Sequence, residues 1–337
     1  MARNRLRLLF TLLLALGVVA LWSSPYEQLY YLLRMPVVWK SSTVDTVLSQ
    51  QQDQFDLTFS SYPANYSTVD AGYTALIPPL LHHIHLGSRP PRQAWLDARR
   101  ECLKYHESWN ATVWTDENAD ALVRNDYPHL YTMWKSYPYP IQRVDALRYM
   151  ILQKYGGVLL DYDLACKRSL EPLRRFDFVA PAAHPAGYSI GMMLSSPNST
   201  YIKALVNNLS AYNHRWAFLP YVTVMFSTGC HYASTIYTLQ SNRTNFRILA
   251  GPADQPRMHM LNGLVNTPLF RHLGSSSWHD RDAHLISLFK NMNLRALLVV
   301  MVMIMFGTAA LVMFYASRRG RAQDSDEERQ ANASKSA

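Results

Sequence analysis

The residues best suited to chemistry are two carboxylates, Asp161 and Asp163, which flank Tyr162 directly after a short apolar run. In extended backbone, residues two apart point the same way, so both carboxylates would lie on one side of a strand end. Hard oxygen ligands of this kind suit a divalent cation, which would also stabilise a departing diphosphate. The triplet therefore predicts a metal-assisted nucleotide-diphosphate site, and the alternative is a solvated turn.

The segment before the triplet favours the chemical interpretation. Residues 141–154 form the clearest predicted helix, because apolar side chains recur there at helical spacing. Gly156 and Gly157 would end this helix. Residues 158–160 are a short apolar run, which is typical of a buried parallel strand. The two carboxylates would thus follow directly on a buried strand.

Predicted strands and helices alternate through the central part of the chain. The strands are expected at 80–86, 111–114, 158–160, 177–180 and 189–194, and the helices at 92–105, from 116, at 141–154 and at 200–212. This alternation indicates an α/β fold with a mostly parallel central sheet. In such folds ligands bind beyond the carboxyl ends of the strands, where Asp161 and Asp163 are expected.

Two apolar runs bracket this α/β region. Residues 6–22 follow three arginines and are near the lower limit for a spanning helix, whereas 294–315 are long enough to span. Arginines after the second run place the C-terminus in the cytosol, like the N-terminus. A cleaved signal peptide is the alternative for the first run, but no small-residue cleavage site stands out. We therefore expect an uncleaved signal anchor and a second transmembrane helix.

The expected organisation follows from these runs. The parts are a cytosolic tail at 1–5, a transmembrane anchor at 6–22, a stem or interfacial segment at 23–76, a lumenal catalytic domain at 77–293, a transmembrane helix at 294–315 and a cytosolic tail at 316–337. Five Asn-x-Ser/Thr triplets agree with a lumenal location, since all of them lie between the two runs, at Asn65, Asn110, Asn198, Asn208 and Asn242.

Aromatic residues follow the first apolar run, namely Tyr26, Tyr30, Tyr31 and Trp39. Amphipathic aromatic side chains at this place suit the interface between membrane and water. The alternative is an ordinary linker that packs on the domain. The pattern alone does not decide between the two.

Charge and cysteine content exclude some functions. The net charge is +9, of which about +5 belongs to the central region, a modest excess that suits phosphate-bearing ligands or an anionic membrane, or a basic solvated face. No basic run with interleaved aromatics indicates nucleic acid. Cys102, Cys166 and Cys230 are widely spaced without a CxxC pair, which argues against a structural zinc site. One disulfide with a free thiol is compatible with this spacing, which does not fix the pair.

The block from Tyr137 to Asp163 resembles glycosyltransferase family 32, whose members carry a DXD sugar-binding motif, and within it the fungal branch that mannosylates inositol phosphoceramide. The block reads YPYPIQRVDALRY and then YGGVLLDYD. Shorter segments at 77–85, 227–229 and 274–279 are similar to further motifs of this family, so the resemblance covers about 77–282. It implies a GT-A-like nucleotide-sugar-binding domain.

The resemblance also implies an activity. We expect a retaining transferase that moves mannose from GDP-mannose to inositol phosphoceramide in the Golgi membrane, with Mn²⁺ or another divalent cation. The endoplasmic reticulum and the vacuole are the alternative locations, and a regulatory membrane subunit is a further partner suggested by analogy. A transferase that acts on protein-linked glycans and an inactive regulatory subunit of a transferase complex are the alternative functions.

Residue roles near the triplet follow from the same resemblance. Asp161 and Asp163 would be the catalytic metal-binding pair, with Asp161 contacting the ribose or the metal. Asp145 and Arg148 are three residues apart on the predicted helix and so share a face. They would bind the hydroxyls of the donor sugar, and their alternative is an ordinary ion pair within the helix.

Further roles fall to the later motif. Ser276 and Trp278 would contact the diphosphate, and Ser276 and His279 would add metal ligands. Trp278 has an ordinary core position as its alternative. His83 and His85 are two residues apart on a predicted strand, so both could face the nucleotide pocket. We expect instead that they are structural histidines with satisfied hydrogen bonds.

One segment departs from the family pattern. Where Gly-x-Ser-Asn-Asp is expected, the chain reads Gly-Tyr-Ser-Ile-Gly from Gly187 to Gly191, so an amide and a carboxylate are missing. In addition, Cys230 follows the Ser-Thr-Gly motif where proline is more usual. This departure predicts a changed donor geometry and motivates the inactive-subunit alternative.

Overall fold

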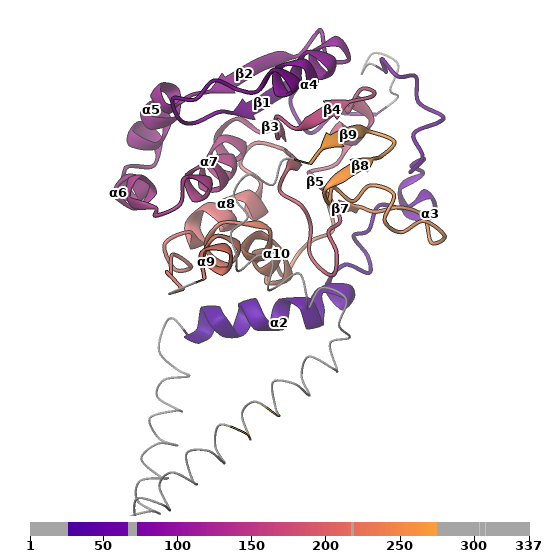
Figure 1. The fold of residues 1–337 in the computed structure, drawn as a ribbon. Helices are drawn as coiled ribbons and strands as arrows, with labels where there is room; N and C mark the ends of the chain where they lie inside the picture. The colour runs from indigo at the N-terminus through magenta and orange to yellow at the C-terminus, as the bar shows by residue number, and fades with distance from the viewer. Residues whose placement is uncertain (1–25, 67–72, 217–218, 275–302, 304–306, 308–337) are drawn as a thin grey trace, which may run out of the picture. The chain divides into compact units, whose positions relative to one another are not determined.

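The computed structural model describes residues 26–66, 73–216, 219–274, 303 and 307, and Figure 1 draws the others as a thin grey trace. The chain divides into two units, 1–280 and 281–337. The fold below is that of the first unit. Its predicted anchor at 6–22 lies outside the described residues, as do both tails and nearly all of the predicted span at 294–315. Among the residues that are described, no helix is long and apolar enough to cross a membrane.

A six-stranded sheet forms the centre of the first unit, in the order β2-β1-β3-β6-β5-β7. The strands are β1 (Leu80–Ile84), β2 (Asn110–Trp114), β3 (Gly157–Leu160), β5 (Phe178–Pro181), β6 (Met192–Ser195) and β7 (Phe246–Leu249). β6 runs antiparallel to its neighbours β3 and β5, and the other paired strands are parallel. The predicted α/β fold with a mostly parallel sheet is confirmed.

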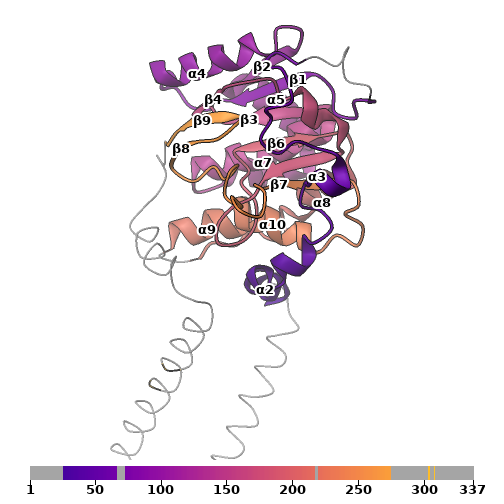
Figure 2. The same cartoon turned by 90° about the vertical axis from the view of Figure 1, so that its right-hand side faces the viewer.

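Helices cover the sheet on both sides (Figures 1 and 2). They are α2 (Tyr26–Ser42), α3 (Gln50–Asp53), α4 (Gln93–Lys104), α5 (Asp116–Asp126), α6 (Pro128–Ser136), α7 (Pro140–Tyr155), the 3-10 helix η2 (Glu171–Arg175), α8 (Thr200–Asn208), α9 (Pro220–Ser227) and α10 (Cys230–Thr238). Helix α8 packs on α7 and on α10; α8, α9 and α10 lie toward the end of the unit that is away from α4 in both views.

Alternate residues of β3 enter two separate cores. Leu159 packs with the helices α5 to α8 and α10. Val158 and Leu160 point to the opposite face, where Phe55 and Phe59 are also fully buried. A strand that is buried on both faces needs apolar residues throughout, which explains the unbroken run before the triplet. The core also contains Phe55 and Phe59 from the segment that the sequence assigns to the stem.

A second, three-stranded antiparallel sheet begins directly after the triplet. Its strands are β4 (Leu164–Cys166), β9 (Phe270–Leu273) and β8 (Leu264–Asn266), in the order β4-β9-β8. A disulfide between Cys102 and Cys166 joins α4 to β4, and Cys230 is a free thiol. The sequence left this pairing open. The triplet therefore lies in the link between two sheets, and the disulfide braces the second of them.

One predicted strand is wrong at its start. The sequence predicts a strand over 189–194, but β6 begins at Met192. The backbone of Ser189 instead bonds to Pro181, and Gly191 N–H donates to the Ser189 hydroxyl. Local bonds of a serine side chain compete with strand pairing. The shift leaves residues 189–191 as a loop that runs past the triplet.

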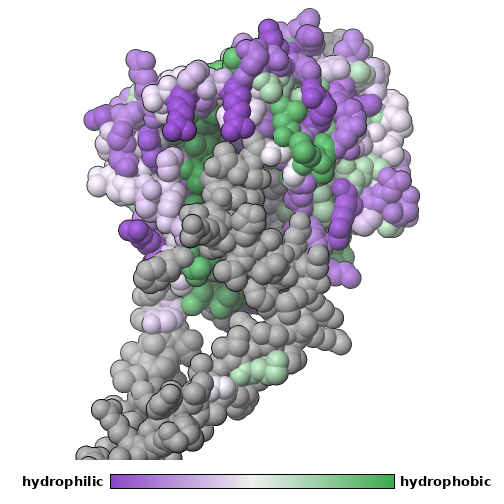
Figure 3. Space-filling model, viewed as in Figure 1, coloured by the Kyte–Doolittle hydropathy of each residue, from purple (hydrophilic) through white to green (hydrophobic). Residues whose placement is uncertain are grey.

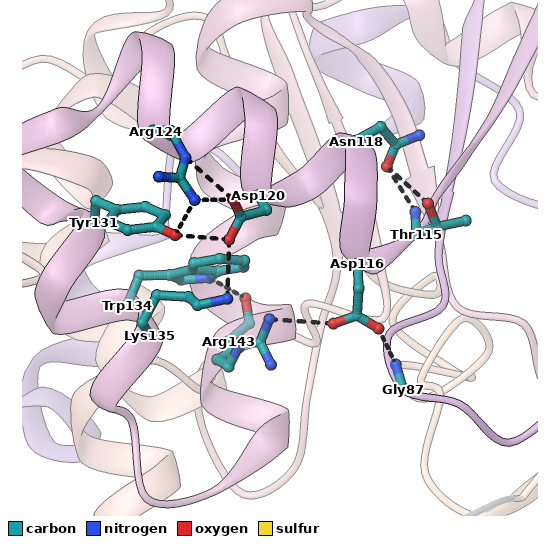
Figure 4. Close-up of polar contacts among 10 residues, drawn as sticks. All are labelled: Gly87, Thr115, Asp116, Asn118, Asp120, Arg124, Tyr131, Trp134, Lys135 and Arg143. Atoms are coloured by element: carbon teal, nitrogen blue, oxygen red, sulfur yellow. Dashed lines mark hydrogen bonds and ion pairs between the residues drawn. The ribbon is translucent and has the colours of Figure 1, made fainter.

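Polar contacts hold α5, α6 and α7 together (Figure 4). The Asp116 carboxylate accepts a hydrogen bond of 2.5 Å from Gly87 N–H and pairs with Arg143 at 3.2 Å. The Asp120 carboxylate accepts from Arg124, Tyr131 and Lys135. The Asp116 contacts attach the loop that follows β1 to α5 and α7, and the Asp120 contacts join α5 to α6.

Candidate active site

The triplet lies at the carboxyl end of β3, where the fold places ligands. Asp161 N–H donates to Gly191 C=O at 2.8 Å, and Leu273 N–H donates to Asp163 C=O at 2.9 Å. The backbone of both aspartates is thus fixed by neighbouring segments. The predicted position beyond a buried parallel strand is confirmed.

Arg148 connects three elements at this position. Its Nη2 lies 2.5 Å from Asp161 Oδ1, and its Nε lies 3.4 Å from Asp145 Oδ1. Its Nη1 donates to Ile190 C=O at 3.3 Å. The Arg148 side chain is only 5% exposed, so this guanidinium is held inside the protein. The ion pair between Asp145 and Arg148, which was the alternative interpretation of these residues, is therefore present. Arg148 also pairs with Asp161, so the ion pair connects the helix with the triplet.

Burial and charge shift the protonation of this cluster. Burial raises the pKa of Asp145 to about 7, although Arg148 opposes the rise. Burial also raises the pKa of Asp161, and the neighbouring Asp163 carboxylate adds to it. Burial disfavours the charged form of Arg148, but Asp161 and Asp145 outweigh this and raise its pKa. A single guanidinium thus offsets the repulsion between neighbouring carboxylates.

The Ser-Thr-Gly motif at the end of α9 supports α7. The Thr228 hydroxyl donates to Asp145 Oδ2 at 3.3 Å, and Thr228 C=O accepts from the Tyr149 hydroxyl at 2.5 Å. Gln142 donates to the Ser227 hydroxyl at 2.7 Å. The motif is therefore a support for the helix that carries Asp145 and Arg148.

His272 on β9 is a site residue that the sequence analysis missed. Its Nε2 donates to Asp163 Oδ2 at 3.2 Å. Burial disfavours the charged form of this imidazole, but the hydrogen bond and charge of Asp163 outweigh it and raise the pKa of His272. His272 reaches the triplet because β9 pairs with β4, where His272 lies opposite Leu164. The sequence contains no local sign of this long-range pairing.

The departure from the family pattern lies against Asp161. A Cβ at Gly191 would meet Asp161 Oδ2 at 2.9 Å, which is closer than ordinary contact. Ile190 is buried and contributes its carbonyl to Arg148. Backbone atoms therefore form this side of the site, where the family pattern has an amide and a carboxylate.

Two histidines of β1 and its loop pack on Tyr162. The ring of His83 lies 5.1 Å and that of His85 5.9 Å from the Tyr162 ring. His85 Nε2 bonds to Arg89 C=O at 2.7 Å. His83 is fully buried, burial lowers its pKa to about 3, and no described residue bonds to its ring nitrogens. His83 is thus a core residue, and a role of either ring in nucleotide binding stays a prediction.

The described residues supply part of a metal site. The carboxylates of Asp161 and Asp163 are close enough for their charges to interact, and their oxygens are ligands that suit a hard divalent cation. Within the described part of the chain, no group of three or more His, Cys, Asp and Glu side chains could hold a metal ion. The predicted ligands Ser276 and His279 lie outside the described residues, as does Trp278.

Residues 92–179 match the family described as "Glycosyltransferase sugar-binding region containing DXD motif". The matched region contains Asp145, Arg148, Asp161 and Asp163. It begins at the entrance to α4 and ends within β5, so it includes the strand and helix that position the triplet.

Longer similarities are to fungal proteins. The chain is 33% identical over 222 residues to mannosyl phosphorylinositol ceramide synthase CSH1 of Saccharomyces cerevisiae, which covers 64% of this chain and 56% of that protein. It is 31% identical over 287 residues to inositol phosphoceramide mannosyltransferase 3 of Schizosaccharomyces pombe, which covers 79% of this chain and 77% of that protein.

Among solved structures, the PaToxG glycosyltransferase matches with a TM-score of 0.37 and 12% identity, over 60% of this chain and 79% of that one. The chain spans little more than half the length of the Saccharomyces relative and about three quarters of the Schizosaccharomyces one. By the DXD-region match and the identity to the latter, the chain belongs to the glycosyltransferase family with a DXD sugar-binding region that includes the fungal inositol phosphoceramide mannosyltransferases.

Proposed function

We propose that the protein is a membrane-bound mannosyltransferase that transfers mannose from GDP-mannose to inositol phosphoceramide, with retention of configuration and with a divalent cation such as Mn²⁺. The supporting observation is the buried Arg148 between Asp145 and Asp161 at the end of β3. The relatives named above carry this acceptor lipid in their names. The expected location is the Golgi membrane, with the catalytic domain in the lumen.

In this proposal Asp161 and Asp163 would hold the cation, which when bound would offset the charge of the leaving diphosphate. Arg148 favours the ionised form of Asp161, against the effect of burial on the pKa of this carboxyl, and fixes the direction of the side chain. His272 donates a hydrogen bond to Asp163 Oδ2 and so holds that carboxylate in place. The chain's own contribution is thus a pair of carboxylates whose positions are set before the donor binds.

Asp145 has a separate task in this proposal. Its carboxylate is buried on α7 and is already bonded to Arg148 and Thr228. Burial has removed water from the Asp145 carboxylate. A hydrogen bond from a sugar hydroxyl would take the place of a bond from water. The acceptor hydroxyl would then attack from the face that GDP leaves, and its proton would pass to the departing diphosphate oxygen.

A second candidate function is an inactive subunit that stabilises an active transferase. It is favoured by Ile190 and Gly191, since these residues present an apolar side chain and bare backbone where a polar pair is expected. Such a subunit would bind nucleotide and cation without transfer. Transfer of mannose therefore distinguishes the two candidates, since only the proposed enzyme would catalyse it.

The test is transfer in membranes that contain the full chain. Membranes would receive GDP-mannose with labelled mannose, and lipid and protein fractions would be counted separately. We expect label in a lipid that comigrates with mannosylated inositol phosphoceramide, and its loss in the Asp163→Asn variant. Label in the protein fraction would show that the acceptor is a protein-linked glycan and not the lipid. No label in either fraction would favour the inactive subunit.

A further inference from the structure

Helix α2 has two different apolar faces. One face carries Leu32 and Met35, which are buried, and Trp39, which is partly buried. The other carries large apolar side chains that are exposed. A helix on the surface of a globular unit normally has a single apolar stripe, which faces the core. The second stripe of α2 therefore needs an explanation.

The buried face fixes the orientation of α2. His231 of α10 bonds to Leu32 C=O at 2.7 Å. The Trp39 ring lies 5.4 Å from the Tyr237 ring of α10 and 6.4 Å from the Tyr188 ring. Both views place α2 beside α10, at the end of the unit away from α4 (Figures 1 and 2). The contact with α10 thus determines which face of α2 points outward.

The outward face is a continuous apolar stripe. Tyr26, Tyr30, Leu33 and Val37 are 41%, 57%, 60% and 63% exposed, and they follow one another at intervals of four, three and four residues. This spacing puts all four on one side of a helix. Val44, just beyond the helix, is also exposed. Exposed apolar side chains that are contiguous mark a surface for binding, whereas isolated ones do not.

The rest of the described surface differs from this stripe. Where Figure 3 is coloured, hydrophilic residues predominate along the upper rim of the face, and hydrophobic residues lie among and below them. Among the other exposed large apolar residues, Leu239 lies beside α2, and the rest are dispersed along the chain, at Leu76, Leu96, Tyr155, Leu219, Leu264 and Met303. Exposed apolar side chains at regular helical spacing are thus a feature of α2.

We propose that the outward face of α2 lies in the interfacial layer of a phospholipid bilayer, with the helix parallel to the membrane plane. The stripe combines tyrosines, which prefer the membrane interface, with aliphatic side chains. Arg34 and Lys40 are exposed on its flanks, and Glu27 is the acidic residue of the helix. Long basic side chains on the flanks of such a helix extend toward the phosphate groups of the lipid headgroups.

The position of α2 in the chain supports a bilayer over other occupants. Its first residue, Tyr26, comes four residues after the apolar run at 6–22 that the sequence predicts to be a membrane anchor. A helix that begins so close to an anchor would stay near the membrane surface. The stripe therefore continues a membrane attachment that the sequence already predicts.

The inner face of α2 also contacts the loop beside the triplet. A Cβ at Gly187 would meet Ser234 Oγ of α10 at 2.6 Å and Met35 Cε at 3.9 Å. From Gly187 the chain runs to Gly191, whose carbonyl holds Asp161. A bilayer against α2 would thus set the distance of the catalytic carboxylates from the lipid acceptor. This consequence rests on the proposed function, whereas the surface itself does not.

The test places a fluorophore on α2 and measures its surroundings. Leu33→Cys and Val37→Cys would be made separately in the full chain with Cys230→Ser, which leaves the disulfide in place. Each would carry an environment-sensitive label in vesicles of phosphatidylcholine and phosphatidylserine. Quenching by lipids with a nitroxide on the acyl chain would be compared with quenching by aqueous iodide. Leu264→Cys, at a residue that is 80% exposed on β8, is the matched control.

We expect lipid quenching at both α2 positions to exceed that at the control by roughly threefold or more, with iodide quenching reduced. Iodide quenching equal to that of the control would place the face in water and overturn the proposal. Protection from both quenchers would show that protein, such as a second copy of the chain, covers the face, and would overturn it too. Thermal unfolding of each labelled variant would verify the fold, and the readout is independent of transferase activity.

Discussion

Arg148 Nη2 lies 2.5 Å from Asp161 Oδ1, which joins the middle of α7 to the carboxyl end of β3. The guanidinium is buried, whereas 37% of the Asp161 side chain is exposed. The buried Arg148 thus binds one oxygen of the Asp161 carboxylate, while part of the Asp161 side chain remains exposed. This arrangement can present a carboxylate to a ligand with its direction already fixed.

Replacing Arg148 by Met tests this relationship. The change leaves Asp145 buried without its cation and frees Asp161, so we expect transfer to fall by about 100-fold or more. Stability should fall by about 3 kcal/mol, because the fully buried Asp145 is left without its cation. Transfer assays and thermal unfolding of the purified chain would measure both. Arg100→Met, which removes an exposed ion pair on α4, should leave both unchanged.

His272→Gln tests the support of Asp163. The glutamine amide would not restore the charged hydrogen bond to Asp163 Oδ2, so the carboxylate should bind a cation less firmly. We expect the Mn²⁺ concentration for half-maximal activity to rise by about 10-fold or more, as is usual when the partner of a metal ligand is lost. A metal titration of activity that matches the unchanged protein would contradict this role.

Gly191→Ala tests the close approach of the loop to the triplet. The new Cβ would lie 2.9 Å from Asp161 Oδ2, so the carboxylate must shift, which disturbs its contact with Arg148. We expect transfer to fall by about 10-fold at little change in stability. In a chain that already carries Asp161→Ala, the same change should have no further effect, since its partner is absent. An equal effect in both backgrounds would show that Gly191 acts elsewhere.

The pH dependence of stability tests the buried His83. Burial lowers its pKa from 6.5 to about 3, so the folded protein favours the neutral ring. Its contribution to stability is present in full above pH 6.5 and is lost as the pH falls toward 3. With about 1.4 kcal/mol per pKa unit, the loss reaches at most about 5 kcal/mol.

His83→Phe should therefore unfold less readily than the unchanged protein at pH 4, while the two should be similar at pH 7. The control is His129→Gln, which removes an exposed imidazole on α6. It should leave the loss of stability between pH 7 and pH 4 unchanged. Thermal unfolding between pH 4 and 7 gives the comparison. A variant that remains as acid-sensitive as the unchanged protein would mean that His83 is not the group responsible.

The helix, strand and triplet before residue 164 could be predicted from the sequence because their signals are local. The apolar spacing in α7, the Gly156-Gly157 stop and the run in β3 lie within about thirty residues. That Asp145 and Arg148 share a face of α7 followed from helix geometry, whereas the ion pair of Arg148 with Asp161 was not predicted. These parts of the site depend on few long-range contacts.

Other parts have no such local signal. His272 reaches Asp163 across 109 residues through a pairing of three- and four-residue strands, which is too short to give a pattern. Helix α10 is buried on several sides, with Tyr232, Ile236 and their neighbours in the core, so its sequence shows no single apolar face. For α2 the sequence offered the membrane interface or packing on the domain, and the structure confirms the packing while leaving a second face outward.

The most direct test of the central claim is the thermal stability of the purified full chain with GDP or UDP, each with and without Mn²⁺. A nucleotide-diphosphate site at Asp161 and Asp163 predicts stabilisation by GDP that requires Mn²⁺ and is lost in Asp163→Asn. At 100 times the dissociation constant this stabilisation would be about 2.7 kcal/mol. Equal stabilisation of the unchanged protein and of Asp163→Asn by GDP with Mn²⁺, or none in either, would contradict the claim.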